Sequence, residues 1–174
     1  APRNLKFYTQ TLGMRLIKKT VNQDDTSAYH LFYGDGVASP GADLTFFDFP
    51  TLREQRGNHT VGRTGLRVDS EETLKWWKEH LEANQVSTSG IRERLGHVSM
   101  DFEDFEGQRF RLVVDGRNKV IPWAKSPVPE DKQIIGLGPI TLSVPKLEPT
   151  DAMLTRVMNM RQVRHYAARE RGGE

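Results

Sequence analysis

The sequence predicts an α+β protein built from repeated βαβββ modules, with modules 1 and 2 followed by the start of a third. Two observations lead to this fold class. A helical pattern occurs three times in the same internal register, and segments with strand-like alternation stand before and after the helices. A pattern that recurs in register indicates a repeated supersecondary unit.

The three predicted helices share the order of their apolar residues. Residues 4–15 read NLKFYTQTLGMR, residues 150–161 read TDAMLTRVMNMR without a gap, and residues 73–81 read TLKWWKEHL. Apolar residues at helical spacing indicate an amphipathic helix that covers a sheet. The middle helix buries Leu74, Trp77 and Leu81 in this interpretation. The positions expected to face water are Lys75, Lys78, Glu79, His80 and Glu82.

The helix boundaries are marked by their end residues. Residues 69–72 (DSEE) resemble a capping box, and Pro149 suits the first turn of the third helix. Gly13 can take the left-handed conformation that ends a helix, and Asn159 occupies the matching position in the last copy. These signals predict that the first helix ends near residue 13, that the second begins near residue 70, and that the third runs from near residue 149 to near residue 159.

The strands are predicted from alternating apolar residues between turn-forming segments. They cover residues 15–21, 28–33, 43–48, 65–68, 98–102, 108–114 and 140–144. A strand should also precede Leu5, but only four residues stand before it. The chain is therefore expected to begin after its first strand, and its last module is expected to be incomplete as well.

Four segments follow from these elements. Residues 1–55 form a first βαβββ module that lacks its first strand, and residues 56–116 form a second module. Residues 117–134 form a Pro-containing linker that should be extended. Residues 135–174 begin a third module.

The composition excludes several classes of function. The 25 basic and 23 acidic side chains are interspersed and give a net charge of only +2, which argues against nucleic acid as a partner. No apolar run approaches the roughly 20 residues that a membrane helix needs, so no membrane association is expected. The absence of cysteine excludes disulfides, thiolate zinc sites and thiol nucleophiles, and it fits a cytoplasmic protein.

Several short segments of the sequence indicate which protein family the chain resembles. The segments FYTQTLGMRL at 7–16, KKTVN at 18–22, YHLFYGD at 29–35 and LTFF at 44–47 resemble the opening module of hydroquinone-type ring-cleaving dioxygenases. Residues 94–107 and 136–150 resemble the second module and the entry to the third. The chain is thus similar to members of the vicinal-oxygen-chelate superfamily, which includes glyoxalases, extradiol dioxygenases and bleomycin-resistance proteins. Full members of this kind carry four modules.

This resemblance implies the cofactor and the reaction. Such enzymes open a hydroquinone or catechol ring with Fe(II) and O2, and two His and one carboxylate on one face of the metal leave positions open for both reactants. In the family, one His lies on the opening strand of the first module, and the other ligands lie in the last module. No residue of this sequence matches those motifs. We therefore assign no metal ligand and no catalytic residue, and expect Fe(II), or another divalent metal, only for the complete protein.

Three residues are candidates for a substrate pocket. His30 lies in the middle of a predicted strand, so it is a candidate to line the cavity or to hydrogen-bond a group next to the site. The other reading is a satisfied structural histidine. Phe46 and Phe47 end the strand whose alternate side chains face the cavity in such modules. One of them is a candidate to stack on an aromatic substrate, and the other reading is ordinary core packing.

The expected function is ring cleavage of a small aromatic substrate, with O2 as the second reactant. Two rivals stay open: a glyoxalase-like metal-dependent isomerase or lyase, and a module that binds a flat aromatic compound without catalysis. Because a partial module leaves a sheet edge and an apolar helix face uncovered, a homo-oligomer is also expected.

Overall fold

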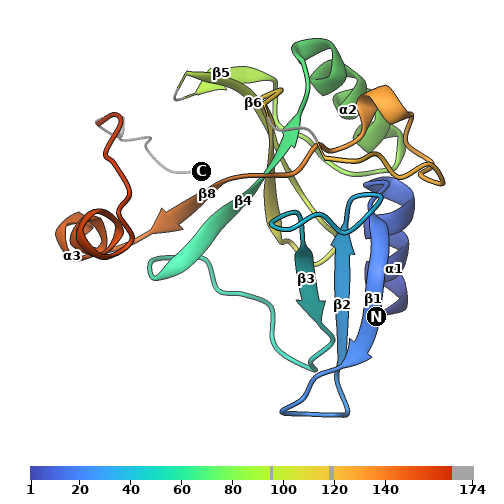
Figure 1. The fold of residues 1–174 in the computed structure, drawn as a ribbon, viewed down its shortest axis with the longest axis horizontal. Helices are drawn as coiled ribbons and strands as arrows, with labels where there is room; N and C mark the ends of the chain where they lie inside the picture. Colours follow the sequence, from blue (N-terminus) through green and yellow to red (C-terminus); the bar gives the residue numbers. More distant parts are fainter. Residues whose placement is uncertain (95, 118–119, 166–174) are drawn as a thin grey trace.

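The computed structural model describes residues 1–94, 96–117 and 120–165. In this part of the chain the strands form one three-stranded and one five-stranded sheet, with helices packed on both, so the α+β class is confirmed (Figure 1). A search of the described residues finds no helix with the length and apolarity that a membrane crossing requires.

The first module contains one helix and three antiparallel strands. Helix α1 (Pro2–Lys6) continues as a π-helical turn, η1 (Phe7–Thr11), and Gly13 ends it at a φ of 67° as predicted. The strands are β1 (Arg15–Val21), β2 (Tyr29–Gly34) and β3 (Leu44–Phe47), in the order β1-β2-β3.

The second module places its first strand beside its last. The elements are β4 (Thr60–Val68), α2 (Glu71–Ala83), β5 (Arg92–Arg94), β6 (His97–Glu103) and β7 (Arg109–Val114). Strand β4 runs parallel to β7, and the order β5-β6-β7-β4 completes a βαβββ unit. Ser70 caps α2 by accepting a hydrogen bond from the backbone N–H of Thr73.

The third unit joins the second sheet through its first strand. Strand β8 (Leu137–Ser143) pairs antiparallel with β4 and is followed by α3 (Leu147–Ala152) and the π-helical turn η3 (Met153–Val157). Helix α3 lies at the far end of the molecule from α1 (Figure 1). Its surroundings are open, so several apolar side chains of this unit are exposed: Ile140, Leu142, Leu147, Met153, Val157 and Met158.

The first two modules share one hydrophobic core. Tyr8 is fully buried and contacts Tyr33 and Phe46 of its own module and Phe110 of the second. On the side of the second module, the core includes Leu74, Trp77 and Leu81 of α2, as the helical spacing predicted. Burial of these large side chains ties the two modules into one body.

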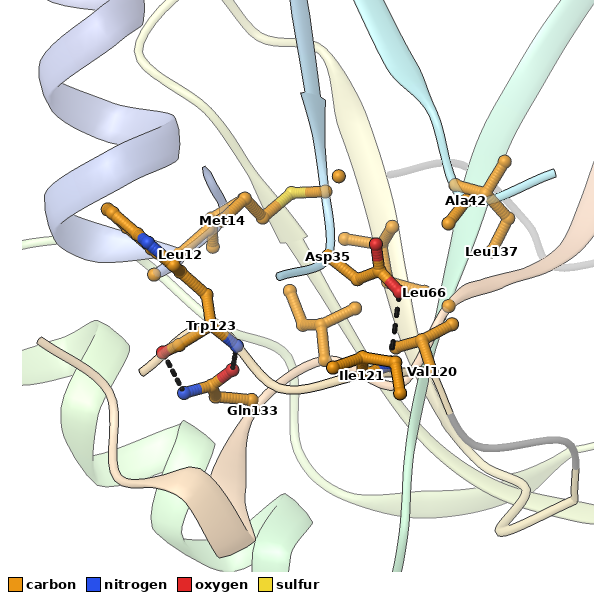
Figure 2. A pocket seen from close by; sticks show the side chains of 14 residues that line it. Leu12, Met14, Asp35, Ala42, Leu66, Val120, Ile121, Trp123, Gln133 and Leu137 are labelled. Carbon is orange, nitrogen blue, oxygen red and sulfur yellow. Dashed lines mark hydrogen bonds between the residues drawn. The ribbon is translucent and has the colours of Figure 1, made fainter. Parts of the chain in front are cut away.

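The Pro-containing segment between the second and third modules packs along the first module. The Asp35 carboxylate accepts a hydrogen bond from the backbone N–H of Ile121, and the Gln133 side chain bonds both backbone groups of Trp123 (Figure 2). The space between these residues and Leu12 measures only about 20 Å³, so side chains already fill it. Val128 is buried against Gly13, where a β-carbon would lie 2.6 Å from Val128.

The predicted position of His80 on the wet side of α2 is wrong. Its ring stacks on Trp76 with centroids 4.6 Å apart, and its Nε2 atom lies 2.9 Å from the carbonyl oxygen of Thr11. The helical pattern shows only which face of α2 covers its own sheet. The neighbouring first module covers the flank on which His80 lies.

Candidate functional site

The two faces of the first sheet differ in their side chains. Leu31, Tyr33 and Phe46 point toward the helix and pack in or against the core. The pairing register places His30 opposite Phe47 and Phe32 opposite Thr45 on the other face. Since successive side chains of a strand alternate between faces, no helix of the first module covers His30 or Phe47.

His30 lies between two aromatic rings on this face. Its ring centroid is 4.0 Å from that of Phe47 in a stacked arrangement and 3.9 Å from that of Phe32. Its Nε2 atom is buried and has no hydrogen-bond partner in the described part of the chain. A buried polar atom without a partner is costly, and a ligand hydroxyl is one group that would satisfy it. We call His30, Phe32 and Phe47 the aromatic face.

Phe46 and Phe47 therefore have different surroundings. The Phe46 ring packs 4.3 Å from Tyr8 and belongs to the partly buried rim of the core. Phe47 is 46% exposed, and its other neighbour is Phe49 at 5.3 Å. Of the three residues predicted from the sequence, the sheet brings His30 and Phe47 into contact and directs Phe46 away from them.

A cavity of about 670 Å³ opens next to the aromatic face. Phe46, Phe47 and Phe49 line it on one side, and the turn at residues 104–108 lines it on the other, whereas His30 lies outside its lining. Its volume is in the range of small-molecule sites, which combine apolar walls with a few polar groups. Phe47 joins this cavity to the aromatic face.

The described residues do not fit a three-ligand metal site. Across residues 1–94, 96–117 and 120–165, no three side chains of the His, Cys, Asp and Glu types come close enough together to hold a metal ion. His59, His97 and His165 are exposed, and His80 packs between the modules. An iron centre of two His and one carboxylate therefore cannot be built from these residues.

Sequence reasoning missed Phe32 and Phe49. Phe32 lies two residues after His30, so the period of two along a strand could have placed both on one face. Phe49 follows the end of β3, where alternation no longer applies, and only the folded chain places it beside Phe47.

The sequence is similar to several ring-cleaving dioxygenases. It is 44% identical over 166 residues to "Putative ring-cleaving dioxygenase MhqA" of Bacillus subtilis, a match that covers 94% of this chain and 52% of the relative. It is 29% identical over 168 residues to chlorohydroquinone/hydroquinone 1,2-dioxygenase of Sphingobium indicum, covering 92% of this chain and 51% of that protein. The chain thus spans about half the length of the curated relatives it matches.

Solved structures show the same fold. A crystal structure described as a "putative dioxygenase" from Bacillus subtilis superimposes with a TM-score of 0.87 at 31% identity, covering 95% of this chain and 53% of that one. Maize glyoxalase I shares the fold at a TM-score of 0.65 and 17% identity, over 94% of this chain and 52% of its own. The model of the Glyoxalase/Bleomycin resistance protein/Dioxygenase superfamily matches residues 1–112. The chain therefore belongs to this superfamily.

Proposed function

We propose that the full-length protein is a ring-cleaving dioxygenase of hydroquinone-like or catecholic aromatics, and that the aromatic face of this chain helps to bind the ring. The names of the similar proteins support the reaction class. The observation that carries the proposal for this chain is the His30 Nε2 atom, which is buried without a partner between Phe32 and Phe47.

The chemistry of this face suits a flat phenolic ring. Phe47 offers an exposed aromatic surface, and offset or edge-to-face contact between rings contributes about 0.5–1.5 kcal/mol beyond the area buried. A ring hydroxyl that reaches Nε2 of His30 would either donate a hydrogen bond or accept one, depending on the tautomer of the imidazole. Such a contact orients the ring as well as binding it.

Fe(II) and O2 complete the proposed reaction. Because the described residues provide no set of three ligands, we propose that the iron is held by parts of the full-length protein outside them. Iron would supply the activation of O2 when it is bound. The residues of this chain would bind and orient the ring.

The proposal is tested by O2 uptake with methylhydroquinone, together with iron analysis, on the full-length protein. One O2 should disappear for each ring consumed, and catalase should release none of it, because both oxygen atoms enter the product. Quinone formation with release of hydrogen peroxide would indicate autoxidation alone. Absence of O2 uptake by the iron-loaded protein would overturn the proposal. Conversion of a thiol adduct would then indicate an isomerase, and binding of the ring without any reaction would indicate a binding module.

A matched pair of variants assigns the role of His30. His30→Phe keeps an aromatic ring in the stack but removes the nitrogen, and His97→Phe makes the same change at an exposed position at the start of β6. We expect the KM for methylhydroquinone to rise about tenfold in the first variant, which corresponds to the loss of one hydrogen bond. The second variant should behave as the unmodified protein.

We also propose that the protein is a homo-oligomer. The exposed apolar side chains of β8 and α3 support this, because large exposed apolar patches commonly mark interaction surfaces. Light scattering of the full-length protein tests it.

A further inference from the structure

A second polar surface lies on the open face of the second sheet, opposite α2. Strand alternation places Arg109 and Arg111 of β7 on this face, beside Asp101 and Glu103 of β6 in the pairing register. Arg63 of β4 joins them from the other side. We call this surface the arginine face; its members are Arg63, Arg94, Arg109, Arg111, Asp101 and Glu103.

Asp101 is shared among three of these arginines. Its carboxylate accepts hydrogen bonds from Arg111 Nε at 2.6 Å and Arg111 Nη2 at 3.1 Å. Arg63 Nε lies 3.2 Å and Arg94 Nη1 3.6 Å from its Oδ2 atom. Burial alone would raise the pKa of Asp101, but the hydrogen bonds and charges of Arg111, with those of Arg63 and Arg94, lower it. Asp101 is therefore ionised and provides one negative charge to three cations.

Glu103 adds negative charge near Arg63, but it shares this charge with two further arginines. It is engaged from the side of the loop after β3, where Arg56 contacts its Oε1 atom at 2.5 Å and Arg53 its Oε2 atom at 3.9 Å. Each of these loop residues brings a further positive charge. The arginine face consequently carries more positive than negative charge.

One of the arginines holds a buried donor without an acceptor. Within the described residues, Nε of Arg109 is buried and makes no hydrogen bond, and its guanidinium approaches a carboxylate only through Nη2, 4.0 Å from Oε1 of Glu54. Nε of Arg63 is also buried without a hydrogen bond, but it lies 3.2 Å from Oδ2 of Asp101, with which it forms an ion pair. Burial lowers the pKa of the Arg63 guanidinium; Asp101 opposes this, while the charges of Arg111 and Arg109 add to it. Buried donors that lack acceptors are uncommon in folded proteins and point to a missing partner.

A cleft of about 880 Å³ is lined by both Arg63 and Arg109. The sheet contributes Arg63, Arg92, Arg94 and Arg109 to its lining, and the first helix contributes Arg3 and Lys6. Three carboxylates also line it, those of Asp101, Glu103 and Asp104, so the cationic side chains outnumber the anionic ones by six to three. The segment at 84–89 adds amide and hydroxyl groups, and Phe105 adds an aromatic ring that packs under Arg3 at 4.5 Å. Positive charge, hydrogen-bonding groups and an aromatic wall together suit an organic anion.

We propose that this cleft binds a small organic carboxylate through the guanidinium groups of Arg63 and Arg109. A carboxylate has two acceptor oxygens in the planar arrangement that a guanidinium matches, and such charge-assisted bonds are about twice as strong as neutral ones. The site is separate from the aromatic face, which lies on the other sheet. It does not depend on the dioxygenase proposal, because none of its evidence involves the aromatic face or a metal.

The test observes the Nε–H groups of Arg63 and Arg109 directly. The side-chain Nε–H signals of arginine are resolved in a ¹H–¹⁵N spectrum, and the full-length protein is titrated with sodium benzoate, with sodium chloride at matched ionic strength and with inorganic phosphate. The proposal expects saturable shifts of the Arg63 and Arg109 signals with benzoate only. Equal shifts with chloride would mean general screening, and shifts with phosphate alone would mean an inorganic anion site; either result overturns it.

Variants supply an independent readout by calorimetric titration. Arg109→Gln should weaken benzoate binding by about tenfold, as expected for one charge-assisted hydrogen bond. Arg117→Gln is the matched control, because Arg117 is exposed and pairs with Asp115 away from the cleft. Asp101→Asn removes the competing carboxylate and should strengthen binding. Equal weakening in the Arg109 and Arg117 variants would contradict a built site.

Discussion

The hydroxyl of Tyr8 donates a hydrogen bond of 2.8 Å to Oδ2 of Asp104, and both groups are buried. The two residues are 96 positions apart and belong to different modules. Asp104 also shapes its own turn, because its Oδ1 atom accepts from the backbone N–H groups of Glu106 and Gln108. A single carboxylate thus orders the 104–108 turn and holds the first helix against it.

Removing this hydroxyl should destabilise the protein. Tyr8→Phe leaves Oδ2 of Asp104 buried without its donor, which costs about 1–3 kcal/mol in free energy of unfolding. Urea denaturation followed by tryptophan fluorescence measures this cost. Tyr29→Phe is the control, because Tyr29 is exposed and should change stability by less than about 0.5 kcal/mol. If Tyr8→Phe has the same free energy of unfolding as the unmodified protein, the hydrogen bond between Tyr8 and Asp104 contributes little to stability.

Stability should fall at alkaline pH, and Tyr8 should account for part of the fall. Burial, and next the Asp104 charge, raise the pKa of Tyr8 well above its usual value, and burial raises the pKa of Tyr33 to about 12. The pKa values of both tyrosines in the folded protein exceed the unfolded value of about 10. The two tyrosines therefore contribute fully to the free energy of unfolding below pH 10, and this contribution is lost as pH rises through the folded values.

The size of this effect follows from proton linkage. Each such tyrosine reduces the free energy of unfolding by up to about 1.4 kcal/mol per pH unit above pH 10. Urea midpoints measured between pH 9 and pH 11.5 should show a shallower decline for Tyr8→Phe than for the unmodified protein. Comparing the two proteins removes the contribution of lysines, which titrate in the same range. Identical slopes would refute the role assigned to Tyr8.

The two neighbouring phenylalanines should respond differently to truncation. Phe46→Ala removes a ring packed on Tyr8 and should lower the free energy of unfolding by about 2–4 kcal/mol, near the lower end for buried phenylalanine because Phe46 is only partly buried. Phe47→Ala removes a ring that is 46% exposed and should cost about 1 kcal/mol or less. Thermal unfolding of both variants checks the assignment, and a reversed order would mean that the strand faces are exchanged.

Local sequence patterns predicted most of the fold because they report on one element at a time. The apolar spacing of α2 and the end of the first helix at Gly13 are both confirmed. Strand β5 (Arg92–Arg94) was missed, since three charged residues carry no apolar alternation and are held only by pairing with β6. His80 was misplaced because its environment is set by the other module.

The candidate sites depend on contacts between elements, which explains why they were predicted only in part. His30 and Phe47 were found separately, but their contact required the register between β2 and β3. The same register directs Phe46 into the core. The arginine face was not predicted at all, because its charged residues come from four strands and gather only through the sheet order.

The proposed role of Phe47 in holding the aromatic ring is tested most directly by steady-state O2 consumption with methylhydroquinone in the full-length protein. We predict that Phe47→Ala raises the KM about tenfold, as the loss of one ring contact and its buried area implies, with a smaller change in kcat. Tyr29→Ala removes an exposed ring beside His30 from the other face of β2 and should leave both constants unchanged. An active Phe47→Ala protein with an unaltered KM would contradict the account.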